Sequence, residues 1–288
     1  MQMVKLKLSP KKQAWVNQFK PEKLRGQPLR VSVSIEKRYA NELQNLINRM
    51  TSDTEDAIKE LFEANDYAAN YAMDANIGSQ ARIKLNALRE WFKKLFGRAS
   101  VYIVDKWLDQ IDKNSASTLK STLIDLAGYE GLKTDILSSE LRDIFTATVN
   151  ANVALIKRVP EEYLDQITGT VMRSIQSGQG MKDLIPFLEK QNVRVSNWAT
   201  NVAADQTRKA YQGITRGRMK ALGIKKYEWV HSGGSRYPRP YHRDVLNGKI
   251  FELDNPPIAD PRTKYRSHPG GEIFCRCTMR VIVDFDAD

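Results

Sequence analysis

The sequence predicts an α+β fold, in which a mainly α-helical N-terminal region precedes a small loop-rich α+β C-terminal domain with a short antiparallel sheet. From about Val33 to Gly223, apolar residues recur at three- and four-residue steps, which is the period of amphipathic helices. After Gly223 the pattern changes to short runs of β-branched and aromatic residues. Six of the 11 prolines lie between residues 238 and 269, so the connections between these runs are predicted to be loops.

The first half of the helical region is predicted to contain two long helices. The first carries a stripe of apolar residues that includes Leu43 and Met50, and a capping box formed by Ser52 and Glu55 predicts that a helix restarts there. The second is expected at residues 83–111, with a bend or interruption at Gly97.

Shorter helices are expected at residues 117–126, 138–158 and 160–177. Pro160 is placed in a first turn, where its missing amide hydrogen costs nothing. Ser196 is predicted to cap the last long helix, which Gly223 ends.

Three strands are predicted beyond Gly223, at residues 225–232, 250–253 and 278–283. The dipeptide Asn247-Gly248 is a strong hairpin-turn signal.

The chain is accordingly divided into three parts. These are a basic N-terminal arm (1–32), a helical region (33–140) and a C-terminal domain (141–288), whose lead-in helices (141–223) precede the α+β segment (224–288).

The net charge of +11 is concentrated at the two ends of the chain. The first 30 residues carry a net charge of +7, residues 31–205 carry −3, and residues 206–288 carry +7. A basic arm can follow a phosphate backbone without reading its sequence, and it can equally dock on an acidic protein partner. Its candidate contacts are Lys5, Lys7, Lys11, Lys12, Lys20, Lys23, Arg25 and Arg30.

An aromatic residue within this charged arm indicates an anchor. Trp15, Val16 and Phe19 lie at one-turn spacing, which is the arrangement of a helix that inserts an apolar face into a partner groove.

Two classes of protein are disfavoured by the composition. No segment has the ~20 apolar residues of a membrane helix, and the N-terminus lacks the apolar core of a signal peptide, so we expect the chain to remain in the cytoplasm where it is made. Only two cysteines occur, Cys275 and Cys277, which excludes a disulfide framework.

The C-terminal segment contains a candidate zinc site. Two imidazoles and two thiols form a suitable ligand set for tetrahedral zinc: His242, His268, Cys275 and Cys277. Residues i and i+2 of a strand share a face, so both thiols can reach one ion. Alternatively, the histidines bond loop backbone and the cysteines are small buried residues. His231 is a less favoured ligand.

Catalysis is not expected. The sequence has no phosphate-binding loop and no dinucleotide-binding glycine motif, and its C-terminal carboxylates lack the clustering that a nuclease metal site needs. A Cys-His nucleophile pair is conceivable, but no spacing singles out a thiol or a base. The arginines of this segment are expected to form salt links or to contact phosphate or a partner: Arg236, Arg239, Arg243 and Arg276.

Five motifs in order over the last part of the chain resemble the phage Mu F-like minor head proteins of tailed double-stranded DNA phages. They are Trp229-Val-His-Ser-Gly-Gly234, Pro238-Arg-Pro-Tyr-His242, Asn247-Gly-Lys-Ile-Phe251, His268-Pro-Gly-Gly-Glu272 and Cys275-Arg-Cys277. The resemblance covers roughly residues 140–285. It departs at Ser235, where many members have Asp.

The resemblance implies a low-copy head-morphogenesis protein that joins the portal during procapsid assembly, contacts DNA in some members and influences packaging or ejection. The implied partners are the portal protein, the major capsid or scaffolding protein, and double-stranded DNA bound without sequence preference; the implied location is the virion, inside the capsid near the portal. One alternative is a zinc-stabilised, sequence-independent DNA-binding module. A Cys/His enzyme or effector is less favoured, because the chain ends five residues after Val283.

Overall fold

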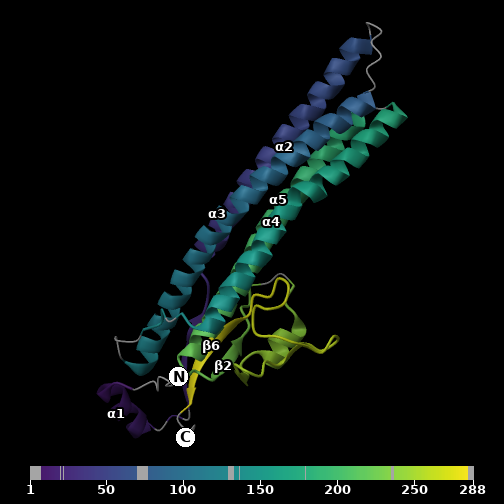
Figure 1. Ribbon diagram of the computed structural model, residues 1–288. Coiled ribbons are helices and arrows are strands. Elements are labelled where there is room, and N and C mark those ends of the chain that lie inside the picture. Colours follow the sequence, from purple (N-terminus) through teal and green to yellow (C-terminus); the bar gives the residue numbers. More distant parts are fainter. Residues whose placement is uncertain are drawn as a thin grey trace. The chain divides into compact units, whose positions relative to one another are not determined.

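A computed structural model describes residues 8–19, 21, 23–69, 77–128, 133–135, 137–178, 180–234 and 237–284, with only the backbone for residues 64–69 and 284. Five helices lead into a C-terminal segment of strands and loops (Figure 1), which confirms the predicted α+β class. The elements are α1 (Pro10–Phe19), β1 (Lys23–Leu29), α2 (Val33–Ala69), α3 (Ile77–Ala127), α4 (Ser139–Ser177), α5 (Met181–Ala221), β2 (Lys226–Val230), the π-helix η1 (Tyr241–Leu246), β3 (Ile250–Glu252), β4 (Ile258–Asp260), β5 (Tyr265–Arg266) and β6 (Thr278–Asp284).

The helices are longer than predicted because local break signals do not end them. α2 passes Ser52, and the nearby hydroxyl of Thr54 donates to the Met50 carbonyl inside the helix at 2.7 Å. α3 is continuous through Gly97 and through the gap expected before residue 117. A polar side chain that bonds its own helix backbone does not need to act as a cap.

Two further predicted helix starts are wrong. Pro160 lies inside α4, and Ser196 lies inside α5. Buried apolar residues continue on both sides of Pro160, including Ile156 and Leu164. Packing of this stripe therefore keeps the helix continuous despite the hydrogen bond that proline removes.

The predicted stop at Gly223 is confirmed. Gly223 has a φ of 77°, its amide donates to the Lys220 carbonyl, and the Ile224 amide donates to the Met219 carbonyl. This is the Schellman pattern, which requires the left-handed conformation that glycine adopts without strain.

The chain divides into two compact units. Unit 1 comprises Met1–Glu36, Trp107–Thr148 and Ala204–Asp288, and unit 2 comprises Lys37–Lys106 and Val149–Ala203. These limits differ from the predicted boundaries at residues 32 and 140, because each of the four long helices contributes residues to both units.

Unit 2 is a helical bundle. Each helix supplies side chains that are at most 1% exposed: Ile47 from α2, Phe92 from α3, Leu164 from α4 and Ala199 from α5. No described helix contains a stretch long and apolar enough to cross a membrane.

Unit 1 contains a four-stranded antiparallel sheet with the order β1-β6-β2-β3. The three predicted strands are present, and Tyr227, Trp229, Met279 and Val281 form its fully buried centre. A second sheet pairs the short strands β4 and β5.

The fourth strand, β1, corrects the prediction of a basic arm over residues 1–32. Lys23 lies opposite Asp284 and Leu29 opposite Met279, with a register shift between Arg25 and Pro28. The sequence Lys-Leu-Arg-Gly-Gln-Pro-Leu contains Gly and Pro, which are depleted in strands. Proline is tolerated here because β1 is an edge strand.

The C-terminal half of α5 ties unit 1 together. The Trp107 indole donates to Thr207 at 2.9 Å, and the Arg218 guanidinium bonds the Thr134 carbonyl and Asp112. The buried amide of Gln212 donates to the Leu29 carbonyl at 3.1 Å and to the Thr278 hydroxyl at 2.9 Å. One helix thereby positions both β1 and the start of β6.

A first prediction concerns the contact between β1 and α3. A Cβ atom added at Gly26 would lie 2.5 Å from Thr122 Cγ2 and 3.2 Å from Leu126 Cδ1. We therefore expect Gly26→Ala to lower the free energy of unfolding by about 1–3 kcal/mol. Gly97→Ala is the matched control, because that Cβ meets nothing within 4 Å and should stabilise α3 by about 0.5–1 kcal/mol.

Urea denaturation of the two variants measures these opposite effects. A Gly26→Ala protein as stable as the parent would contradict the close packing of β1 on α3.

Candidate metal centre

Three of the four predicted ligands are brought together by two segments of unit 1. His242 lies on η1, and Cys275 and Cys277 immediately precede β6. The cysteine segment is attached to α5 because the Phe274 amide donates to the Asp205 carboxylate at 2.6 Å. Phe274 itself has a φ of 56°, which turns the chain towards the cysteines.

The distances fit a metal ligand set. His242 Nδ1 lies 3.6 Å from the Sγ atoms of both Cys275 and Cys277. With Zn–S bonds of about 2.3 Å and a Zn–N bond of about 2.0–2.1 Å, tetrahedral angles require an S···N separation of about 3.6 Å. All three side chains are buried and both thiols are free.

The other side of the His242 ring is oriented by second contacts. Nε2 lies 3.2 Å from the Ala259 carbonyl and 2.8 Å from Glu272 Oε2. Because a carbonyl can only accept, Nε2 carries a proton, and Nδ1 is the ring nitrogen that faces the sulfurs. A carboxylate or carbonyl behind a ligating imidazole is the usual support of a metal-bound histidine.

The electrostatics favour a thiolate at this position. The Cys277 side chain and His242 hydrogen-bond the Cys275 sulfur and lower its pKa to about 4, despite burial. The neighbouring Cys275 raises the pKa of Cys277. Burial lowers the pKa of His242, but contacts with Cys275 and Glu272 outweigh it and the net pKa is raised. The thiolate is the form of cysteine that binds metal.

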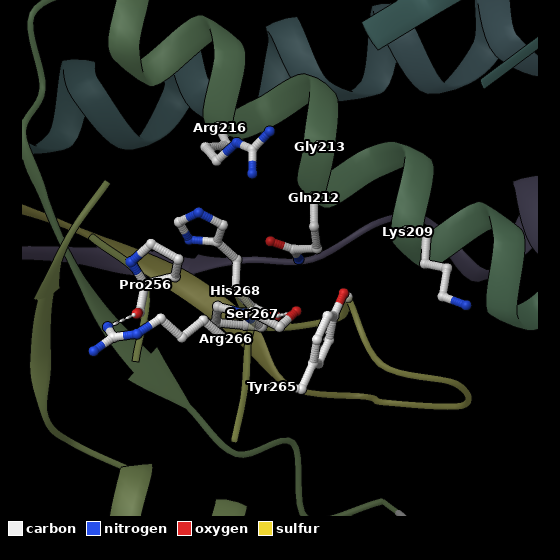
Figure 2. A pocket seen from close by; sticks show the side chains of 11 residues that line it. Lys209, Gln212, Gly213, Arg216, Pro256, Tyr265, Arg266, Ser267 and His268 are labelled. Carbon is white, nitrogen blue, oxygen red and sulfur yellow. Dashed lines mark hydrogen bonds between the residues drawn. The ribbon is translucent and has the colours of Figure 1, made fainter. Parts of the chain in front are cut away.

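His268 is not part of this group, which corrects the predicted set of four. Its Nδ1 hydrogen-bonds the Tyr227 hydroxyl at 3.1 Å, and it lines a different pocket beside Gln212 and Arg216 (Figure 2). Burial and the Arg216 charge lower the pKa of His268 to about 4, so the ring is neutral at pH 7.

A small cavity adjoins the three ligands. It has a volume of about 30 Å³, and its other walls include His231, Tyr237, Arg239 and Arg276. A water molecule needs roughly 10–15 Å³, so the cavity has room for a solvent ligand in a fourth position. His231 accepts a hydrogen bond from the Gly233 amide through Nδ1.

Comparison with known proteins tests the resemblance. The model of the family described as "Phage Mu protein F like protein" matches residues 165–280. The chain carries a Mu F-like segment. This segment contains all of α5, η1 and the Cys-x-Cys pair, whereas β1 lies outside it.

An "Uncharacterized protein" of Haemophilus influenzae (strain ATCC 51907 / DSM 11121 / KW20 / Rd) is 28% identical over 266 residues, which cover 89% of the chain and 55% of that protein. The chain thus spans about half the length of this curated relative. No solved structure matches the chain.

The predicted basic contacts are found in several different environments. Arg25 pairs with Glu228, Arg243 with Asp244, and Arg239 bonds the Ile273 carbonyl near Glu272. Lys11 and Arg30 are exposed. Four of the predicted basic contacts lie outside the described residues: Lys5, Lys7, Lys20 and Arg236.

Glu272 belongs to the motif His268-Pro-Gly-Gly-Glu272, and the motif alone indicates no role for it. Its position behind His242 becomes apparent only when η1 and residues 267–277 meet in space. The signal that could have identified Glu272 is an acidic residue close in sequence to a Cys-x-Cys pair, in a chain that also has a histidine farther away in sequence.

A second prediction follows from this geometry. We expect the purified chain to bind one zinc ion, and Cys275→Ser or Cys277→Ser to abolish binding, because each removes one of three ligands. His268→Gln is the control and should retain the metal. Glu272→Gln should weaken zinc binding by about 10–100-fold through the loss of support for His242.

The zinc content of each protein is measured by metal analysis after purification without chelator. The thiolate absorption of the cobalt-substituted protein reports whether the cysteines bind the metal. Metal-free wild-type protein that also fails to take up added zinc would refute the site.

Proposed function

We propose that the chain is a structural minor head protein of a tailed phage that acts by binding inside the capsid. The observation that carries this proposal is the Mu F-like match over residues 165–280, which supports a role in phage head morphogenesis. The paired Cys275 and His242 have the geometry of a nucleophile and a base, but both are buried, and a buried pair does not favour catalysis on an external substrate.

Helix α1 supports attachment to the portal or to the inner capsid wall. Trp15 and Phe19 are 41% and 59% exposed, and their ring centroids lie 5.4 Å apart. The helix is anchored, because the Ser9 amide donates to the Ala127 carbonyl and the Ser9 hydroxyl caps the Lys12 amide. An exposed aromatic pair on a fixed helix is typical of a protein-binding surface.

The excess of positive charge supports a second contact, with DNA. The net charge of +11 favours nonspecific association with a phosphate backbone through counterion release. Such contacts would aid packaging or ejection. Because Arg25 and Arg243 are paired with carboxylates, the exposed Lys11 and Arg30 are the better candidates among the described residues.

In this proposal zinc would join η1 to the segment that precedes β6 within a loop-rich region. Its binding would stabilise the folded form of that region, because the ligands come together only in the folded chain. Besides the portal and DNA, we propose the major capsid or scaffolding protein as a partner.

The test is co-expression with the portal protein of the same phage, followed by particle isolation and imaging. We expect Trp15→Ala combined with Phe19→Ala to reduce incorporation at least about tenfold, because exposed aromatic anchors contribute about 2 kcal/mol or more to an interface. Trp91→Ala is the control, since Trp91 is 50% exposed on α3. Deletion of residues 1–30 is unsuitable, because it also removes β1.

An unattached monomer in every wild-type preparation would argue against the proposed function. Salt-sensitive DNA binding without any portal association would instead favour a freestanding DNA-binding module.

A further inference from the structure

A pocket separate from the metal centre lies in unit 1 between α5 and residues 256–271. Its volume is about 290 Å³, and 11 residues line it. Three of these are the cations Lys209, Arg216 and Arg266, and no carboxylate is among them. Figure 2 shows Arg216, Gln212 and Lys209 extending from α5 towards the loop that carries Arg266 and His268.

The two arginines have no anionic partner within the part of the chain that the structure describes. Arg266 donates to the Asn255 side-chain oxygen at 3.0 Å and to the Pro256 carbonyl at 2.8 Å, both of which are neutral. Arg216 is half-buried and has neither a hydrogen bond nor an ion pair among the described residues. Lys209, in contrast, pairs with Asp205 at 2.7 Å. Arg266 is exposed, whereas Arg216 is a half-buried cation without a counter-charge, which favours the binding of an anion.

A buried hydrogen-bond acceptor faces the same pocket. Gln212 is 6% exposed, and its Nε2 is engaged by the Leu29 carbonyl and the Thr278 hydroxyl. These two hydrogen bonds fix the orientation of the Gln212 side-chain amide. If its nitrogen and oxygen were exchanged, Oε1 would face the Leu29 carbonyl oxygen, and neither atom could donate. The opposite atom, Oε1, is buried without a donor among the described residues. A buried acceptor of this kind favours a ligand that supplies an N–H or O–H group.

The pocket wall is rigidly packed. Gly270 has a φ of 79°, and a Cβ atom there would lie 2.9 Å from Gln212 Cγ. At Gly271 a Cβ atom would overlap the Ser267 hydroxyl, 2.1 Å away. Gly270 therefore lets the loop lie close against α5, and Gly271 lets it fold closely over Ser267, so a side chain at either position would disturb the pocket wall.

We propose that this pocket binds the carboxylate of an acidic peptide segment in a partner protein. Arg216 and Arg266 pair with the carboxylate, and Gln212 Oε1 accepts a hydrogen bond from a peptide N–H beside it. This inference rests on the proposed function, because it assigns a contact to one of the protein partners of the head.

The buried acceptor Gln212 Oε1 favours a peptide over DNA as the ligand of this pocket. Every residue of a peptide other than proline offers an N–H within a few ångströms of its side chain, whereas an internal phosphodiester of duplex DNA has no donor of its own to satisfy Gln212. A guanidinium also matches the planar carboxylate by two parallel hydrogen bonds.

The experiment titrates the full chain with an acetylated and amidated peptide of alternating Asp and Glu, and with its Asn and Gln counterpart. We expect only the acidic peptide to bind. Its binding should shift the NMR resonances of the Gly213 and Gly271 amides, because both residues line the pocket. Arg216→Gln and Arg266→Gln should each weaken binding at least about tenfold, because each removes a charge-assisted hydrogen bond to the carboxylate. Arg262→Gln, an exposed arginine outside the pocket, should leave binding unchanged.

Three results would overturn the inference. They are equal binding of the neutral peptide, an equal loss in Arg262→Gln, and displacement of the acidic peptide by a short DNA duplex whose own binding requires Arg216. If the peptide does not bind while the wild-type chain still enters particles, the pocket assignment fails and the proposed function stands. If the wild-type chain does not enter particles while the acidic peptide still binds, the proposed function fails and the pocket assignment stands.

Discussion

The pairing of β6 with both β1 and β2 is the constraint on which unit 1 depends. β6 lies inside the sheet, so its backbone groups are bonded on both sides and its residues Met279 and Val281 are fully buried. The two cysteines immediately precede this strand, and the Gln212 amide bonds its first residue, Thr278. The positions of the metal ligands and of the cationic pocket therefore both follow from where β6 begins.

Asp205 and Gln212 show how a single face of α5 organises these two sites. Asp205 accepts the Phe274 amide and so fixes the turn that leads to the cysteines, while it also pairs with Lys209 at the rim of the pocket. Gln212 holds β1 and β6 through its nitrogen and leaves its oxygen to the pocket. A buried polar network of this kind is costly unless each group finds a partner. The Gln212 oxygen has no hydrogen-bond donor among the described residues, which is why it favours a ligand in the pocket.

Much of the fold could be predicted from the sequence, because periodic patterns and glycine stops act locally. The three strands after Gly223 and the pair Cys275 and Cys277 are examples. Continuous helices through Pro160 and Ser196 could not be predicted, since packing of buried stripes overrides local break signals. Neither β1 nor the separation of His268 from His242 could be foreseen, because both depend on which distant segments meet.

The strand β1 has a consequence for how the chain folds during synthesis. Thr278 and Leu29, which hydrogen-bond each other, are 249 residues apart in sequence. At translation rates of about 5–20 residues per second, β1 waits for roughly ten seconds or more after it leaves the ribosome before its partner exists. Helices, whose contacts are local, form far sooner. The sheet is thus completed only after β6 has been synthesised, and the metal ligands can assemble only once the cysteine segment has followed η1 out of the ribosome.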